Sequence, residues 1–121
     1  MANKVSQIKL IPAEVQLTSA IGASVAIRIN AYTADGQPFD LTPYTITAPF
    51  ISPNGSPAVP PIEEWAMVLE TSSVHLSVTR EDTLALAPIG STTWHWAVWL
   101  AHNTAPTDLL FAHGDLVLLS P

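Results

Sequence analysis

Four histidines are the side chains best suited to acid–base chemistry or metal binding in this sequence of 121 residues. They are His75, His95, His102 and His113. Their spacing matches no zinc pattern, such as two histidines one helical turn apart. His75 and His95 fall on the expected outer faces of strands, where solvated or partner-facing residues are typical. We therefore expect no metal and no cofactor.

The sequence supports catalysis by a nucleophile or by paired carboxylates no better than it supports metal binding. No serine lies in a Gly-x-Ser-x-Gly elbow, the turn that exposes a serine nucleophile. Glu63 and Glu64 are adjacent, so on a strand they face opposite sides and cannot share one proton. The chain has no cysteine, which removes thiolate nucleophiles, thiolate metal sites and disulfides together. We expect a protein without catalytic residues, not an enzyme.

The tryptophans carry the clearest signal for binding. From Trp94 onward the apolar pattern has a period of two, so Trp94 and Trp96 share one face of a strand while His95 and Trp99 share the other. The inward pair predicts a packed core. An outward tryptophan beside a histidine fits a protein contact or a platform on which a sugar stacks.

Both interpretations of Trp99 stay open. Asn103 and Asp108 follow in the next turn and could supply the polar groups that sugar binding needs. The charged residues make up 12% of the chain, against about 25% in typical domains, which favours a protein interface. The predicted contact residues are Trp99, His95 and Trp65, Pro53, Asn54 and Val59 of a proline-rich segment, and Val5 and Ile8 near the N-terminus.

These residues require a framework of strands. The periodicity predicts about eight strands and one short helix. Thr79 and Asp82 form a capping-box pattern for a helix over residues 80–86, which Pro88 and Gly90 should close. The predicted strands cover residues 15–18, 25–30, 44–51, 65–69, 74–79, 93–101, 109–112 and 116–119.

Turn chemistry supplies the connections. Asp35 and Gly36 predict a hairpin turn followed by another strand, because glycine accepts the positive φ of such turns. Residues 113–115 predict a second tight turn, and Pro49 places its strand at an edge or a bulge. Residues 52–61 hold four prolines and a glycine, a composition typical of a protruding loop.

Together these elements predict an all-β fold, an immunoglobulin-like antiparallel β-sandwich. One such domain would span residues 13–121, because the chain is too short for a second domain. Residues 1–12 would form an N-terminal arm or an edge strand.

Charge excludes several classes of partner. The formal net charge is −6, and the fixed cations are Lys4, Lys9, Arg28 and Arg80. This set contains no basic patch for phosphates, so we expect neither nucleic acid nor an anionic membrane surface as a partner. No apolar run suits a signal peptide or a membrane-spanning helix, which predicts synthesis in the cytoplasm and no membrane insertion.

Two passages resemble a known family. ADGQPFDLT (residues 34–42) resembles a turn and strand in the N-terminal β-sandwich of baseplate upper proteins and related tail-tip and fibre proteins of long-tailed bacteriophages. LSVTREDTLAL (residues 76–86), WHWAVWL (94–100) and LFAHGDLVL (110–118) resemble that family's short helix, strand and closing hairpin. Pro43 and the proline-rich segment depart from the family pattern.

The resemblance implies a non-enzymatic structural protein of a phage virion. Such a module would bind other virion proteins of the tail tip or baseplate, in a symmetric homo-oligomer or multi-copy ring. A capsid decoration protein is the alternative within this class, and a carbohydrate-binding adhesion module is the alternative of another class.

Overall fold

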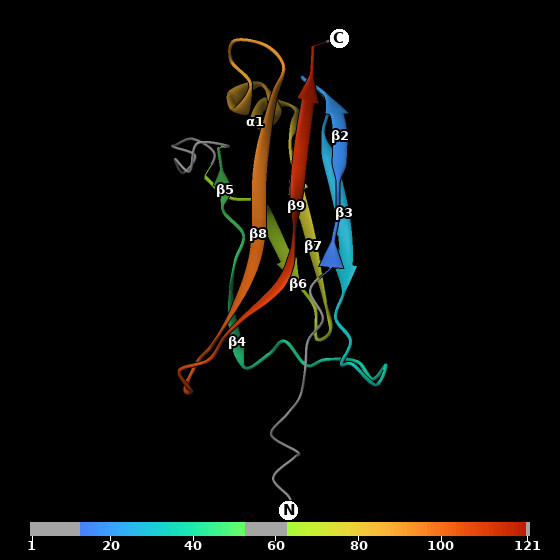
Figure 1. The fold of residues 1–121 in the computed structure, drawn as a ribbon, viewed down its shortest axis with the longest axis vertical. Coiled ribbons are helices and arrows are strands. Elements are labelled where there is room, and N and C mark those ends of the chain that lie inside the picture. The colour runs from blue at the N-terminus through green and yellow to red at the C-terminus, as the bar shows by residue number, and fades with distance from the viewer. Residues whose placement is uncertain (1–12, 53–62, 121) are drawn as a thin grey trace, which may run out of the picture.

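The computed structural model describes residues 13–52 and 63–120 of the chain, which contain nine strands and one helix arranged in two facing sheets (Figure 1). An all-β sandwich is thereby confirmed. The elements in chain order are β1 (Ala13–Glu14), β2 (Leu17–Ala20), β3 (Val25–Asn30), β4 (Tyr44–Thr47), β5 (Phe50–Ile51), β6 (Ala66–Leu69), β7 (Ser73–Val78), α1 (Arg80–Leu86), β8 (Thr92–His102) and β9 (Asp108–Leu119).

The order of strands is that of an immunoglobulin-like sandwich. One sheet has the order β3-β7-β6, and the other runs from β1 and β2 through β9 and β8 to β4 and β5. With β1 and β2 counted as the first strand and β4 and β5 as the third, the smaller sheet corresponds to strands B, E and D of that fold and the larger sheet to C, F and G. The first strand lies beside the last strand in the larger sheet, and not in the sheet of B, E and D as in constant-type domains, and the helix lies between the fifth and sixth strands. The sandwich was predicted to be antiparallel throughout, and this prediction was wrong for the first two strands, because β1 and β2 pair with β9 in parallel. Parallel neighbours need a long connection, and here the rest of the domain provides it.

The longest hairpin, β8 and β9, forms the centre of the larger sheet (Figure 1). The alternation predicted for β8 is confirmed, since Trp96, Val98 and Leu100 are buried and Trp99 is exposed. A register shift occurs between Val98 and Trp99, and such a bulge increases the local twist of the hairpin. The inward side chains pack against β3 and β7 of the other sheet in one hydrophobic core.

The turn predicted at residues 113–115 does not exist, and β9 continues through Gly114. An ideal Cβ at Gly114 would lie 1.7 Å from the carbonyl oxygen of Val15. The Val15 N–H in turn donates to the His113 carbonyl at 2.9 Å. Glycine inside a strand therefore marks a close approach of backbone here, not a turn.

The helix is capped as predicted. The Thr79 hydroxyl accepts a hydrogen bond from the Asp82 N–H at 3.1 Å, and the Asp82 carboxylate accepts one from the Thr79 N–H at 2.9 Å. At the other end, the Trp94 indole N–H donates to the Leu86 carbonyl at 2.8 Å. Both ends of α1 are thus tied, one to its own cap and one to β8. No helix in the described residues is long and apolar enough to cross a bilayer.

The turn predicted at Asp35 and Gly36 is present, but the strand expected after it is not. Gly36 has a positive φ of 90°, and the Thr33 N–H donates to the Gln37 carbonyl at 2.8 Å. The pairing that follows is limited to a bridge between Tyr32 and Pro38 and a hydrogen bond from the Phe39 N–H to the Ala31 carbonyl at 2.9 Å. The chain then crosses to the other sheet, because Phe39 and Leu41 insert into the core with exposed fractions of 6% and 3%. We infer that the free energy gained by burying these two side chains exceeds the contribution that further strand pairing would make at this point.

Pro49 lies between the two short edge strands β4 and β5, which confirms its predicted place at an edge. The break leaves the Ala48 N–H free to donate to the Glu64 carboxylate at 2.8 Å. Phe50 pairs its N–H with the Glu63 carbonyl at 3.0 Å. Glu63 and Glu64 therefore belong to the junction that leads into β6.

Candidate functional site

An exposed tryptophan ring, that of Trp99, lies on the outer face of the larger sheet. We define the Trp99 face as the outward side chains Thr47, Ile51, His95, Ala97, Trp99 and Ala101. The side chain of Trp99 is 43% exposed, and Thr47 of β4 and Leu110 of β9 are its cross-strand neighbours. An open depression of about 390 Å³ beside the ring is lined by Thr47, Trp99, Ala101 and Asp108.

His95, predicted as a contact residue, lies on this face between two neighbours. Its Nδ1 is 2.5 Å from the Asp115 carboxylate across the hairpin, and Ile51 pairs with it on the other side. Half of the His95 side chain is exposed. Two side chains are too few to hold a metal ion, and the described residues contain no group of three or more histidines or carboxylates able to do so.

Asn103, the other polar residue expected near Trp99, is already engaged. Its amide oxygen accepts a hydrogen bond from the Thr45 hydroxyl at 2.6 Å. The polar groups left beside the Trp99 ring are the Thr47 hydroxyl and the Asp108 carboxylate. The ring of polar groups that would favour a sugar site at Trp99 is therefore incomplete.

Trp65 is a core residue, which corrects its prediction as a contact. It is 2% exposed, and its ring centroid lies 5.2 Å from that of Phe50 and 5.6 Å from that of Trp96. Aromatic rings at these separations attract one another beyond simple burial. The other predicted contacts, Pro53, Asn54, Val59, Val5 and Ile8, lie outside the described residues.

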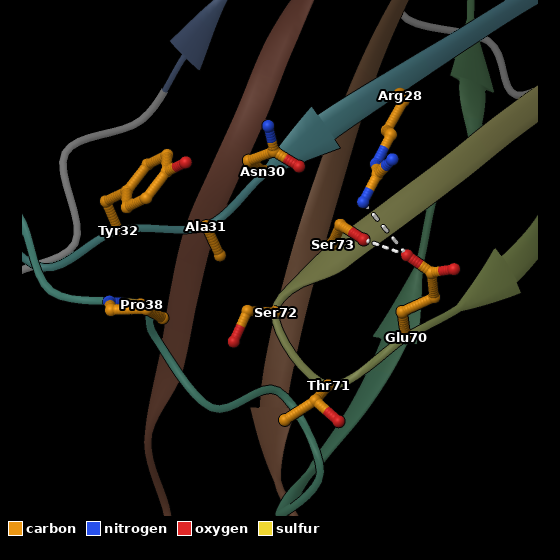
Figure 2. A pocket seen from close by; sticks show the side chains of 9 residues that line it. All are labelled: Arg28, Asn30, Ala31, Tyr32, Pro38, Glu70, Thr71, Ser72 and Ser73. Atoms are coloured by element: carbon orange, nitrogen blue, oxygen red, sulfur yellow. Dashed lines mark hydrogen bonds and ion pairs between the residues drawn. The ribbon is translucent and has the colours of Figure 1, made fainter.

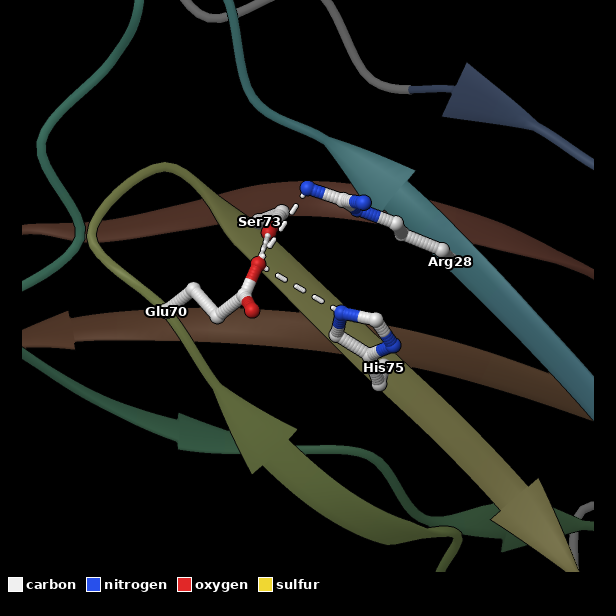
Figure 3. A network of polar contacts seen from close by, with 4 residues as sticks. All are labelled: Arg28, Glu70, Ser73 and His75. Carbon is white, nitrogen blue, oxygen red and sulfur yellow. Dashed lines mark hydrogen bonds and ion pairs between the residues drawn. The ribbon is translucent and has the colours of Figure 1, made fainter.

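The opposite sheet carries a polar network that the sequence did not reveal (Figure 3). One oxygen of Glu70, Oε1, accepts from the Ser73 hydroxyl at 2.6 Å and from the Arg28 guanidinium at 3.2 Å. The Nε2 of His75 lies 3.4 Å from the same oxygen. Arg28 and His75 are cross-strand partners on β3 and β7, so the sheet register brings them together.

This network holds a serine, a histidine and a carboxylate, but not in a catalytic order. In a serine triad the hydroxyl donates to the histidine, and the histidine donates to the acid. Here the hydroxyl and the imidazole both approach Glu70, and the structure places no hydrogen bond between Ser73 and His75 among the described residues. Ser73 is also only 3% exposed. The cluster fixes the β6–β7 turn and orients Arg28.

The pKa of the Glu70 carboxyl lies below its ordinary value of 4.5, first because the Ser73 hydroxyl donates to it, then because the His75 imidazole lies close to it, and also because of the positive charge of Arg28. A carboxyl with a depressed folded pKa contributes stability that is present above its unfolded pKa and is lost as the pH falls through the folded value.

We therefore predict a pH-dependent effect of Glu70→Gln. The variant should lose more free energy of unfolding, relative to the wild type, at neutral pH than below pH 4.5. Urea unfolding at a series of pH values measures this difference. Glu63→Gln, at an exposed position near the start of β6, is the control. A difference between Glu70→Gln and wild type that stays constant with pH would contradict the prediction.

Comparisons with known proteins add little to this picture. No family model matches the chain, and no curated protein matches it. Similar solved structures include a family 123 glycoside hydrolase from Clostridium perfringens, from a study of glycolipid glycan hydrolysis, with a TM-score of 0.47 and 12% sequence identity. The match covers 89% of this chain but only 23% of that chain. A similarity of this size assigns neither family nor activity.

Proposed function

We propose that this chain is a non-enzymatic structural module of a bacteriophage virion, which docks on a neighbouring tail-tip or baseplate protein through the Trp99 face. The observation that carries the docking surface is the 43% exposed ring of Trp99 on β8, an inner strand of the larger sheet. Small side chains, Ala97 and Ala101, flank it along β8. A partner can therefore approach the ring closely.

The composition of this face supports a protein partner. Tryptophan is the residue type most enriched among interface hot spots, and charged residues are depleted from interface centres. On the Trp99 face the Asp108 carboxylate lines the depression beside the ring, and the His95–Asp115 pair lies four residues earlier along β8. Ile51, 36% exposed, adds apolar area on the same face.

The kind of assembly comes from the sequence resemblance. The motifs at residues 34–42, 76–86, 94–100 and 110–118 resemble those of phage baseplate and tail-tip sandwiches, so the proposed partners are other virion proteins around a symmetric tail axis. The proposed location is the virion, in several copies. In the alternative role of a capsid decoration protein, the module would dock through the same face, but on the capsid surface and not on a tail protein.

Incorporation into particles tests this proposal. Trp99→Ala should lower the number of copies per purified particle by roughly 30-fold if affinity limits occupancy, since truncating a hot-spot residue commonly costs about 2 kcal/mol or more of binding energy. Quantitative mass spectrometry of gradient-purified phage measures the copies. Thermal unfolding of the free variant should stay close to the wild type.

Val68→Ala is the matched control. Val68 is 66% exposed on β6 of the other sheet, so this substitution removes exposed apolar surface at a place away from the Trp99 face. This variant should incorporate as the wild type does. Normal incorporation of Trp99→Ala would rule out the Trp99 face as the docking surface.

A further inference from the structure

A second concave site lies at the end of the smaller sheet (Figure 2). The cavity has a volume of about 340 Å³, and its polar lining includes Arg28, Asn30, Tyr32, Glu70, Ser72 and Ser73. It lies on the sheet of β3, β7 and β6, whereas Trp99 belongs to the other sheet. The docking surface proposed above and this pocket are therefore separate.

The walls of the pocket are held by backbone hydrogen bonds. The Ala31 N–H, just after β3, donates to the Ser72 carbonyl at 2.8 Å, and the Glu70 N–H donates to the Ser73 carbonyl at 2.9 Å. The isolated β-bridge between Tyr32 and Pro38 holds a third wall of the pocket. A site with fixed walls binds a ligand without first ordering its own chain.

The charges in this pocket balance. Glu70 Oε1 accepts from both Arg28 and the buried Ser73 hydroxyl, so the guanidinium and the carboxylate neutralise one another. Within the described residues, the side-chain contacts of Glu70 with Arg28, Ser73 and His75 all use Oε1. Oε2 thus stays available as an acceptor, and the remaining guanidinium N–H groups stay available as donors. An anion or a cation would meet one partner and one like charge, whereas a neutral ligand with hydroxyl groups suits both.

The other residues that line the pocket also suit a neutral ligand with hydroxyl groups. Tyr32 is 52% exposed and offers a ring face for an apolar C–H surface. The exposed side chain of Asn30 lies beside it in the pocket (Figure 2), and an amide both donates and accepts hydrogen bonds. A ligand with one apolar face and a rim of hydroxyls is a saccharide.

We propose that this pocket binds a neutral oligosaccharide. One pyranose ring stacks on Tyr32 and bonds to Asn30, and the next ring lies toward Arg28 and Glu70, at the other end of the pocket (Figure 2). A second open depression, of about 400 Å³, adjoins the first and shares Glu70 and Thr71 of the β6–β7 turn with it. Tyr44 lines that depression, so the adjoining sugar extends toward it. The ligand is a chain, not an isolated monosaccharide.

Saturation-transfer NMR with four neutral oligosaccharide probes tests this inference. The probes are a hexamer each of glucose, galactose, mannose and N-acetylglucosamine, followed by calorimetric titration of those that bind. At least one probe should bind the intact chain. Tyr32→Ala and Asn30→Ala should each weaken binding of that probe about tenfold, as expected when a stacking face or a hydrogen bond to the ligand is lost.

Two further variants make the result specific. Tyr32→Phe keeps the ring and should bind as the wild type does, which separates stacking from a general loss of structure. Trp99→Ala should also leave sugar binding unchanged, even if it abolishes incorporation into particles. The inference is wrong if none of the four probes binds, or if binding survives Tyr32→Ala and is lost in Trp99→Ala. Those outcomes leave the proposed assembly role to be judged on incorporation alone.

Discussion

Replacement of Trp65 by alanine is expected to lower the free energy of unfolding by about 3 to 5 kcal/mol, the usual cost of removing a buried tryptophan. Trp65 is 2% exposed and lies between the rings of Phe50 and Trp96. Its removal leaves a cavity between the two sheets that the surrounding strands can fill only in part. Urea unfolding followed by circular dichroism measures the loss.

Two variants separate the causes of this loss. Trp65→Phe keeps an aromatic ring and removes an indole N–H that has no partner within the described residues, so it should cost much less than Trp65→Ala. Trp99→Ala removes the same side chain from the surface and should cost less than about 1 kcal/mol. Equal losses for Trp65→Ala and Trp99→Ala would mean that the burial pattern given above is wrong.

Gly114→Ala is the second substitution with a large expected effect. A Cβ at this position would lie 1.7 Å from the Val15 carbonyl oxygen and 2.7 Å from its carbonyl carbon. These are backbone atoms, so no side chain can rotate away, and either β9 or the first two strands must move. We expect a loss of about 3 kcal/mol or more, the upper part of the range for overpacking.

The location of the damage distinguishes this effect from a general cost of replacing glycine. Hydrogen exchange should show lost protection at the Val15 and Ile21 amides, which donate to carbonyls of β9. Gly36→Ala is the control, because its Cβ meets nothing within 4 Å but its φ is positive. That variant should cost only about 1 to 2 kcal/mol, the penalty of left-handed backbone. Gly114→Ala with unchanged stability would contradict the packing of β1 and β2 on β9.

The elements that the sequence predicts correctly are governed by local rules. The capping box of α1 spans four residues, from Thr79 to Asp82, and the alternation in β8 extends over eleven. Patterns of this kind need no knowledge of distant contacts. The outward position of Trp99 followed from this alternation and is confirmed.

The errors arise where a distant segment decides the structure. Gly114 resembles a turn residue, but it is required by the backbone of Val15, which the fold brings from the other end of the domain. Trp65 precedes a strand of only four residues, too short for its phase to show which way the ring points. Arg28 and Glu70 are separated by 42 positions, and only the pairing of β7 with both β3 and β6 brings them into one pocket.

Cryo-electron microscopy of purified phage particles from a genome that encodes this chain tests the central claim most directly. The account predicts several copies of the sandwich around the tail axis, each with Trp99 buried against a neighbouring protein. Copies spread over the icosahedral shell would replace the tail-tip role with capsid decoration. Particles that lack the chain, or that carry it with the Trp99 face turned to solvent, would contradict the account.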